Sequence, residues 1–345
     1  MNRTRSVKSA GMRKVNVLVN LPAGFFATPC LKPALRRLSR VARLRKRSHN
    51  AAEEIAADLA WADAVIMWSW PALTPELLDG APRLKFVGHI DVTQGAARVE
   101  LARGMAVSVS RRGFSPAVAE MALALTLSTL RKVSDYHAAM RQGNESWVGR
   151  FPDDIPPEER QLTGRNVGIV GFGGIGRRLA ELLAPFGCRL RVYDPFVAPE
   201  TAARCGARRV PLLRLMRESE IVVLCAASNP GTRRLLGRTE IGALRPGALI
   251  VNVARAALVD TDALAARLRK GDICAAIDVF DNEPLPKDSP LRKLPNAYLS
   301  PHRAGGILES VERIVAWLVD DLEAHLAGRK RAHALTEEMI PGLDG

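Results

Sequence analysis

The sequence contains no apolar run long enough to span a membrane. Its longest runs, such as residues 121–127, fall far short of the roughly 20 residues that a transmembrane helix needs. The basic start of the chain lacks the apolar stretch and cleavage site of a secretory signal. The five cysteines form no CxxC pair, so we expect reduced thiols, no metal site and a cytoplasmic protein.

Acidic residues are missing from the first 52 positions, which carry thirteen Lys and Arg. The whole chain has a net charge of +14, so the rest of it is nearly neutral. We predict one helix over residues 31–47 from an apolar stripe at Leu31, Leu35, Leu38, Val41 and Leu44. We interpret the arginines on its other faces as solvated. A patch for nucleic acid or another polyanion is the alternative, but no nucleic-acid motif supports it, and neither nucleic acid nor a membrane is an expected partner.

Strands and helices are predicted to alternate along both halves of the chain, which at 345 residues is long enough for about two domains. Short apolar strands are expected at residues 15–19, 64–68, 84–88, 106–109, 167–170, 189–193, 221–225, 248–253, 273–277 and 297–299. Longer helices are expected over 115–140, with Ser115 as N-cap, and over 307–326. Such alternation predicts an α/β fold with parallel, doubly wound sheets.

The most informative stretch is residues 166–194, NVGIVGFGGIGRRLAELLAPFGCRLRVYD. An apolar strand breaks at Gly171, Gly173 and Gly176, and an amphipathic helix, a second strand and Asp194 follow. This is the order and spacing of a dinucleotide-binding βαβ unit. Gly171 permits the tight turn, Gly173 lets a pyrophosphate approach the backbone, and Gly176 lets the helix pack close to the strand. Free N–H groups at the helix start would bind the phosphates.

Asp194 is placed to accept hydrogen bonds from the adenosine ribose hydroxyls. Its charge would repel a ribose 2′-phosphate, and Pro195 rather than an arginine follows it. NAD is therefore favoured over NADP, although Arg191 lies nearby on the strand. The full predicted cofactor-binding set is Gly171, Gly173, Gly174, Ile175, Gly176, Asp194, Ala226, Val253 and Asp278.

Three charged residues lie beyond the ends of predicted strands, where open α/β sheets bind ligands. Arg255 stands in NVARAALVD, Glu283 in DVFDNEP and His302 in LSPHRAGG. Arg255 is suited to binding a carboxylate through its guanidinium and to polarising the adjacent carbonyl. His302 can donate a proton to the carbonyl oxygen, and Glu283 would favour its charged form and orient it. Together the three supply what reduction of a 2-oxo acid needs.

From residue 162 to about 328 the chain resembles the D-isomer-specific 2-hydroxyacid dehydrogenases. The matching segments are LTGRNVGIVGFGGIG, YDP, LRPGALIVNVARAALVD, AAIDVFDNEPLP and SPHRAG, with SPAVAEMALAL resembling the family's first interdomain helix. The resemblance implies that Arg255, Glu283 and His302 are catalytic, that Asp194 binds ribose, and that Asp278 lies near the nicotinamide. It also implies a homodimer that associates through the cofactor domain.

The resemblance further implies two Rossmann-like domains, with the cofactor domain inserted into the substrate domain. We place a flavodoxin-like substrate domain at residues 12–116 and 307–345 and the dinucleotide-binding domain at 117–306. Residues 1–11 are expected to be disordered.

Two segments depart from the family pattern. Alanines, Ala256 and Ala257, stand where the family has two glycines after the arginine, which would strain a left-handed turn. Residues 84–100 lack the glycine-rich turn whose N–H groups hold the substrate carboxylate, and Val92 and Thr93 are our substrate-binding candidates there. Asp91 would repel an anionic substrate unless it points away or is paired. His89 could pair with it, or be a satisfied histidine at a strand end, the reading that we favour.

We expect an NAD-dependent enzyme that transfers a hydride between nicotinamide and the C2 carbon of a small 2-oxo or 2-hydroxy acid. The alternative is a catalytically silent, NAD(H)-sensing binding protein, like the corepressors related to this family. The intact set of Arg255, Glu283 and His302 argues against it. Trp68 and Trp70 end a predicted strand of the substrate domain, where they could wall an apolar pocket or simply pack in the core.

Overall fold

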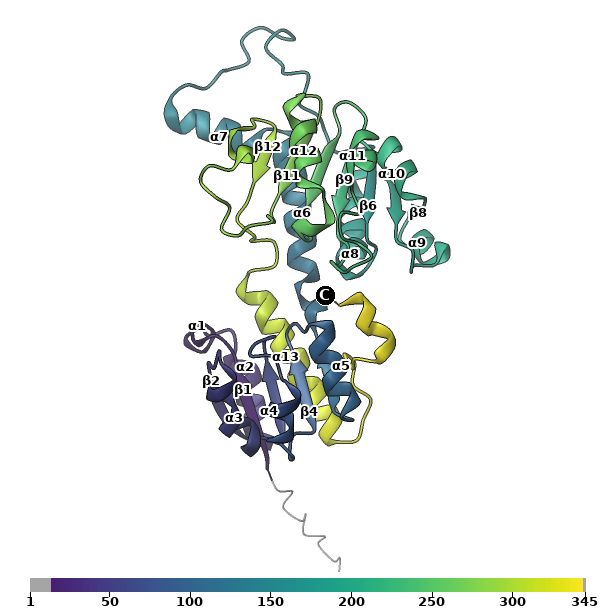
Figure 1. Ribbon diagram of the computed structural model, residues 1–345. Helices are drawn as coiled ribbons and strands as arrows, with labels where there is room; N and C mark the ends of the chain where they lie inside the picture. Colours follow the sequence, from purple (N-terminus) through teal and green to yellow (C-terminus); the bar gives the residue numbers. More distant parts are fainter. Residues whose placement is uncertain (1–13, 344–345) are drawn as a thin grey trace, which may run out of the picture. The chain divides into compact units, whose positions relative to one another are not determined.

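Two parallel β-sheets organise the chain, and the computed structural model describes residues 14–343 of it (Figure 1). The chain divides into two units. One contains the residues up to Arg111 together with Val311–Pro341, and the other contains Arg112–Ser310. The boundaries predicted at 116/117 and 306/307 lie close to these divisions, whereas the predicted disorder of residues 1–11 concerns residues outside the described part.

The first unit is built on a five-stranded sheet of order β2-β1-β3-β4-β5, in which every pairing is parallel. Its strands are β1 (Val15–Asn20), β2 (Ala42–Arg47), β3 (Ala64–Met67), β4 (Phe86–His89) and β5 (Ala106–Val109). Its helices are α1 (Ala23–Ala27), α2 (Lys32–Val41), α3 (Ala52–Trp61), α4 (Pro75–Asp79), α5 (Gln94–Ala102) and most of α13 (Leu308–Leu326). The Ser108 hydroxyl donates to Asp321 at 2.7 Å, which ties α13 to this sheet.

The prediction of one helix over residues 31–47 was wrong. α2 ends at Val41, and β2 follows it as the edge strand of the sheet, paired with β1. Arg45 and Arg47 alternate along β2 and both donate to Asp58 of α3, at 2.8 Å each. This alternation follows the two-residue period of a strand. Charged side chains are common on edge strands because they discourage pairing with a further strand.

The second unit is built on a seven-stranded parallel sheet of order β12-β11-β10-β9-β6-β7-β8. Its strands are β6 (Asn166–Val170), β7 (Arg189–Tyr193), β8 (Ala207–Arg209), β9 (Ile221–Leu224), β10 (Leu249–Asn252), β11 (Cys274–Ile277) and β12 (Ala297–Leu299). Its helices are α6 (Ser115–Leu130), α7 (Val133–Gln142), α8 (Gly174–Leu183), α9 (Pro199–Arg204), α10 (Leu212–Glu218), α11 (Arg238–Gly242) and α12 (Thr261–Arg269), with a short helix η3 (Ala256–Leu258).

Side chains of this sheet alternate between two apolar cores. Val167 and Ile169 face the core that holds α6 and α8, whereas Val170 and Ile250 face the core that holds α10, α11 and α12. When helices cover both faces of a parallel sheet, each of its strands is a continuous run of apolar residues. The strands were therefore recognisable from the sequence. The predicted α/β class with parallel sheets is confirmed.

The helix predicted over residues 115–140 is two helices. Lys132 has a left-handed φ of 49° and separates α6 from α7. The N-cap of α6 is Phe114, so Ser115 is its first residue rather than its cap. Residues 111–130 are the one described helical stretch that is long and apolar enough to cross a membrane by composition. Half of that window is buried within the structure, as in a core helix, and α6 packs against α8.

α7 and the loop after it, residues 133–160, expose several large apolar side chains, and we call this segment the arm. Trp147 is 75% exposed, Phe151 78% and Met140 52%. In Figure 1 the loop projects away from the sheet of its own unit. Several exposed apolar side chains on one segment make the arm a candidate interaction surface.

Candidate functional site

The glycine turn follows β6, which is the strand at which the chain order of the second sheet reverses. Open parallel sheets bind ligands at such a point, beyond the carboxyl ends of the strands. Gly171 has a φ of 90°, and a Cβ there would lie 2.4 Å from the backbone nitrogen of Ala226. A Cβ at Gly176 would lie 2.3 Å from the Gly171 carbonyl oxygen. The predicted residues Gly171, Gly176 and Ala226 are thus in close contact.

The residues around this turn fit a dinucleotide. A Cβ built on Gly173 would meet nothing within 4 Å, so the backbone there is open to a ligand. α8 begins at Gly174, and the first N–H groups of a helix have no partner within it. Ile175 and Val253 belong to the apolar core that holds α6 and α8, and Val253 is buried. Their contact with a cofactor stays a prediction.

Asp194 lies directly after β7, beside the glycine turn. Its carboxylate accepts the N–H of Phe172 at 2.8 Å and that of Phe196 at 2.9 Å. A carboxylate has about four acceptor positions, so capacity remains for ribose hydroxyls. Arg191 donates to Glu218 at 2.7 Å and to Asn166 at 3.0 Å and is therefore engaged elsewhere.

A cavity of about 340 Å³ lies next to Asp194, lined by Tyr193, Pro199, Arg209, Val210 and Pro211. Arg209 is exposed and donates to the Pro195 carbonyl at 3.4 Å. It is the basic side chain that the structure places beside the residue following Asp194, and it was not predicted from the sequence. Its position on the neighbouring strand β8 became apparent only from the sheet order.

His302 and Glu283 are brought together: Nδ1 of the imidazole lies 2.6 Å from a Glu283 carboxylate oxygen. The other Glu283 oxygen accepts the N–H of Phe280 at 2.9 Å. Partial burial alone would raise the pKa of Glu283, but the hydrogen bonds from His302 and Phe280 and the charges of His302 and Arg255 lower it. Within the described residues, Nε2 of His302 has no hydrogen-bond partner, so it can serve a substrate.

The backbone of His302 is strained, with a left-handed φ of 51°. Asp278 holds this loop in place: its carboxylate accepts the N–H groups of Arg303 and Ala304, each at 2.9 Å, and the Ser300 hydroxyl. Its carbonyl oxygen accepts the His302 N–H at 2.8 Å. Asp278 is fully buried, so in this structure it positions His302, and its predicted place near the nicotinamide stays a prediction.

Arg255 follows β10 and lies close enough to Glu283 to affect its pKa. The buried Asn252 side chain donates to the Arg255 carbonyl and accepts from the Ala254 N–H, both at 3.1 Å. This role of Asn252 was not predicted, although a polar residue ending an apolar strand was a usable signal. Ala256 and Ala257 form η3 without a left-handed φ, so the alanines cause no strain.

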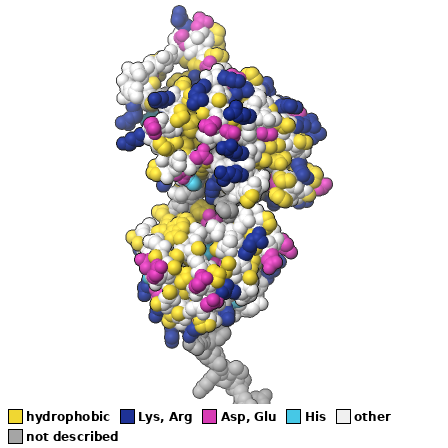
Figure 2. Space-filling model, viewed as in Figure 1, with side chains coloured by type: hydrophobic (Ala, Val, Ile, Leu, Met, Phe, Trp, Pro, Cys, Tyr) yellow, Lys and Arg dark blue, Asp and Glu magenta, His cyan; other side chains and the backbone are white. Residues whose placement is uncertain are grey.

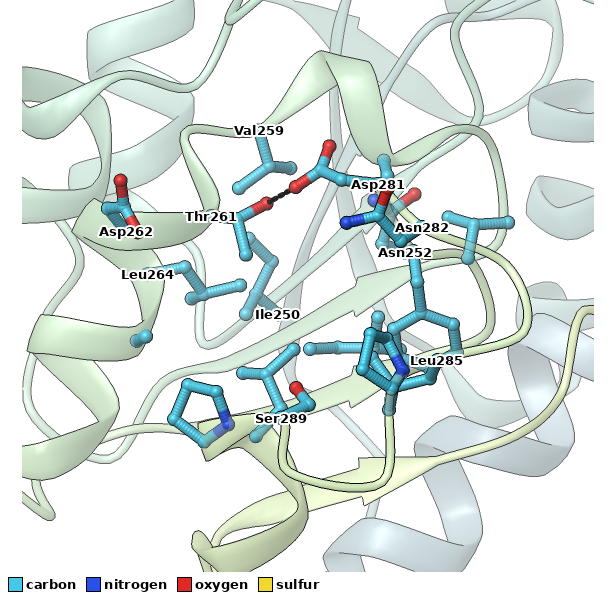
Figure 3. A pocket seen from close by; sticks show the side chains of 18 of the residues that line it. Ile250, Asn252, Val259, Thr261, Asp262, Leu264, Asp281, Asn282, Leu285 and Ser289 are labelled. Carbon is cyan, nitrogen blue, oxygen red and sulfur yellow. Dashed lines mark hydrogen bonds between the residues drawn. The ribbon is translucent and has the colours of Figure 1, made fainter.

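A second cavity, also about 340 Å³, lies behind the Glu283 loop, between α12 and residues 280–291 (Figure 3). The Thr261 hydroxyl donates to Asp281 across it at 2.6 Å. None of the three predicted catalytic side chains lines it. It is therefore separate from the candidate active site.

The predicted substrate loop belongs to the first unit and differs from expectation. Val92 is buried, and its N–H donates to Asp91 Oδ1 at 3.0 Å. The Thr93 hydroxyl caps α5 by accepting the N–H of Ala96 at 3.4 Å. The Val92 N–H therefore already has a hydrogen-bond acceptor in Asp91. Substrate binding by Val92 and Thr93 stays a prediction. Asp91 also lies 3.9 Å from Arg111, which offsets its charge.

His89 pairs with Glu100 rather than with Asp91, at 2.8 Å and with both side chains buried. Burial alone would lower the pKa of His89, but the charge and hydrogen bond of Glu100 raise it. The favoured expectation of a satisfied strand-end histidine is thus confirmed. Glu100 was missed because the helix that carries it, α5, was not predicted.

A family of known proteins matches most of the second unit. Residues 123–304 match the family model described as D-isomer specific 2-hydroxyacid dehydrogenase, NAD binding domain. The glyoxylate reductase of Aeropyrum pernix is 33% identical over 285 residues, which cover 81% of this chain and 84% of that protein. The D-3-phosphoglycerate dehydrogenase of Methanocaldococcus jannaschii is 28% identical, and the match covers 91% of this chain but only 59% of that longer protein.

Solved structures share the fold over nearly the whole chain. The TT0316 protein of Thermus thermophilus has a TM-score of 0.75 and 31% identity, covering 93% of this chain and all of that one (100%). The NADPH-dependent glyoxylate/hydroxypyruvate reductase of Sinorhizobium meliloti, solved with NADP and malonate, has a TM-score of 0.74 and 26% identity, with 96% and 99% covered. The expected pair of Rossmann-like domains is confirmed.

Proposed function

Because the chain belongs to the D-isomer specific 2-hydroxyacid dehydrogenase family, we propose that it is a nicotinamide-dependent oxidoreductase that interconverts a small 2-oxo acid and the corresponding 2-hydroxy acid. The observation that carries the proposal is the 2.6 Å contact between His302 and Glu283. When bound, the nicotinamide supplies the hydride for reduction and accepts it in oxidation.

Each of the three side chains has one task. In reduction, His302 gives the proton from Nε2 to the substrate oxygen, and in oxidation it takes that proton back. Glu283 orients the ring through Nδ1, which leaves Nε2 available to the substrate. Arg255, a permanent cation with a forked set of donors, holds the substrate carboxylate and polarises the carbonyl beside it.

We propose NAD rather than NADP as the cofactor. The argument is the carboxylate of Asp194 at the ribose position, which would repel a 2′-phosphate. Arg191 does not offset that charge, because it is bonded to Glu218 and Asn166. Arg209 is the side chain that could favour NADP instead, so both cofactors belong in the assay.

We also propose a homodimer as the assembly. The arm supports it, because apolar side chains as exposed as Trp147 and Phe151 gain free energy when a partner covers them. A second copy of the chain would cover them, in keeping with dimerisation through the cofactor domain.

The proposed reaction is tested by assaying the full chain with NADH and NADPH against glyoxylate, pyruvate, hydroxypyruvate and larger 2-oxo acids. We expect turnover with NADH, and we expect His302→Ala to lower kcat by about 100-fold or more, since it removes the proton donor. NADH binding, followed by cofactor fluorescence, should be retained.

His137→Ala is the matched control, because His137 is an exposed histidine of α7 in the same unit. It should leave turnover unchanged. Full activity in His302→Ala would remove His302 from the mechanism. Tight NADH binding by the wild type without turnover of any acid would instead favour a binding protein.

A further inference from the structure

Three aromatic side chains lie in a row beyond the carboxyl ends of β1 and β3, and we call them the aromatic row. Phe25 of α1 stacks on Trp68, with ring centroids 5.8 Å apart and planes 16° apart. Trp68 in turn lies 5.2 Å from Trp70. Trp70 is 38% exposed and the other two are half-buried, so the row is not part of the core. In Figure 2 hydrophobic side chains gather on the surface over α1.

Buried polar groups hold the row in place. The Asn20 amide, at the end of β1, donates to the carbonyl oxygens of Trp70 at 3.4 Å and His49 at 3.1 Å. His89, at the end of β4, lies 3.4 Å from the Trp68 carbonyl and is itself fixed by Glu100. These contacts join the ends of three neighbouring strands, so the row is a preformed surface rather than a set of independent side chains.

The segments that carry the row contain no charged residue. None occurs from Leu21 to Leu31 or from Trp68 to Pro75. At the end of β2, Arg47 and His49 are both bonded to Asp58, at 2.8 and 2.9 Å. The row therefore offers aromatic faces to a ligand but no cation of its own for a phosphate or a second carboxylate. Apolar and aromatic groups gain most from such a surface.

We propose that the aromatic row binds the substrate side chain and that the preferred substrate is a 2-oxo acid with a branched or aromatic apolar side chain. The inference rests on the proposed function, and on the rule that open parallel sheets bind ligands beyond the carboxyl ends of their strands. The row shares that edge of the first sheet with residues 91–93, the predicted substrate loop. Glyoxylate has a hydrogen in place of a side chain on C2, and phosphorylated 2-oxo acids have a charged side chain. Both are therefore poor partners for this surface.

The test is a comparison of kcat/KM for glyoxylate, 4-methyl-2-oxopentanoate, phenylpyruvate and 3-phosphooxypyruvate with NADH. In the wild type we expect the two apolar acids to exceed the other two by about 10-fold or more, since each buried apolar group discriminates on this scale. Trp70→Ala should lower kcat/KM for the apolar acids by about 10-fold and leave glyoxylate within about 2-fold. Trp70→Phe keeps an aromatic face and should retain most of the preference.

Several outcomes separate this inference from the proposed function. A wild type that prefers glyoxylate or the phosphorylated acid would overturn the aromatic row as a substrate site while leaving the enzyme assignment intact. An equal loss for all four acids in Trp70→Ala would also overturn it, because the residue would then act on folding or on the common chemistry. Turnover of no acid with either cofactor would remove the proposed function, and this inference with it.

Discussion

Glu283 acts on His302 through one short hydrogen bond. The charge of the Glu283 carboxylate in that bond depends on pH. Its pKa is lowered, with burial opposing and the His302 and Phe280 hydrogen bonds prevailing. A group with a lowered pKa stays ionised across the neutral range, so the contact weakens only when the pH falls below the usual carboxyl range. Glu283→Gln removes the carboxylate that accepts from the imidazole. We expect kcat for reduction to fall about 10-fold, and the loss of activity that protonation of Glu283 causes in acid to disappear from the pH profile.

The measurement is kcat with NADH from about pH 4 to about pH 7, which extends into the range in which carboxylates titrate. Asp281→Asn is the matched control, since Asp281 belongs to the same loop but bonds to Thr261 instead of His302. Its profile should keep the wild-type shape. A Glu283→Gln profile that still falls in acid as the wild type does would mean that Glu283 only anchors the loop.

At the residue level the sequence indicated that Glu283 and His302 would lie together, but it did not indicate which residues hold their loops in place. Glu283 and His302 could be predicted because each follows a strand, and strand ends meet at one edge of a parallel sheet. The bonds from Ser300 to Asp278 and from His89 to Glu100 could not, because they join residues that only tertiary packing brings together.

At the scale of elements, β2 and α3 are joined by one buried carboxylate. Asp58 accepts from Arg45 and Arg47 and contacts His49 at 2.9 Å. Burial opposes its ionisation, but the hydrogen bonds of His49 and Arg45 and the charge of Arg47 lower its pKa. Its stabilising contribution is therefore present above the usual carboxyl range and is lost as the pH falls through the lowered pKa.

We expect Asp58→Asn to lower the free energy of unfolding by about 1–3 kcal/mol at neutral pH, a loss reduced from that of a fully buried pair because the arginines are partly exposed. Urea unfolding followed by circular dichroism would measure this, and the difference from wild type should shrink in acid. Asp79→Asn, which breaks the exposed pair with Arg103, should cost less than about 0.5 kcal/mol. Equal losses in the two variants would contradict the structural role of Asp58.

The edge strand β2 also shows where periodicity misleads. Leu35 and Leu38 lie on the buried face of α2, and Leu31 precedes its first residue. Val41 ends the helix and is exposed, and Leu44 lies in β2, so their spacing does not mark a buried helix face. The competing signal was the alternation of basic residues in ARLRKR, which has the period of a strand. The charge excess was thus located correctly, but part of it stabilises a sheet edge by bonding to Asp58 rather than coating a helix.

At the scale of the whole molecule, the alternation of strands and helices was enough to predict two parallel α/β units, because buried parallel strands are continuous apolar runs. The arm could not be predicted from such patterns. Residues 143–160 are polar and proline-bearing in sequence, and only the structure shows that Trp147 and Phe151 stand exposed on them.

The arm therefore supplies the test of assembly. If a second copy covers it, the wild type should sediment at twice the monomer mass of 37.5 kDa, and Trp147→Glu with Phe151→Glu should sediment as the monomer. The introduced charges would be costly to bury against an apolar partner. Phe196→Glu is the matched control, since Phe196 is 89% exposed in the same unit but lies outside the arm. A monomeric wild type, or a dimer that only Phe196→Glu dissociates, would show that the arm is not the interface.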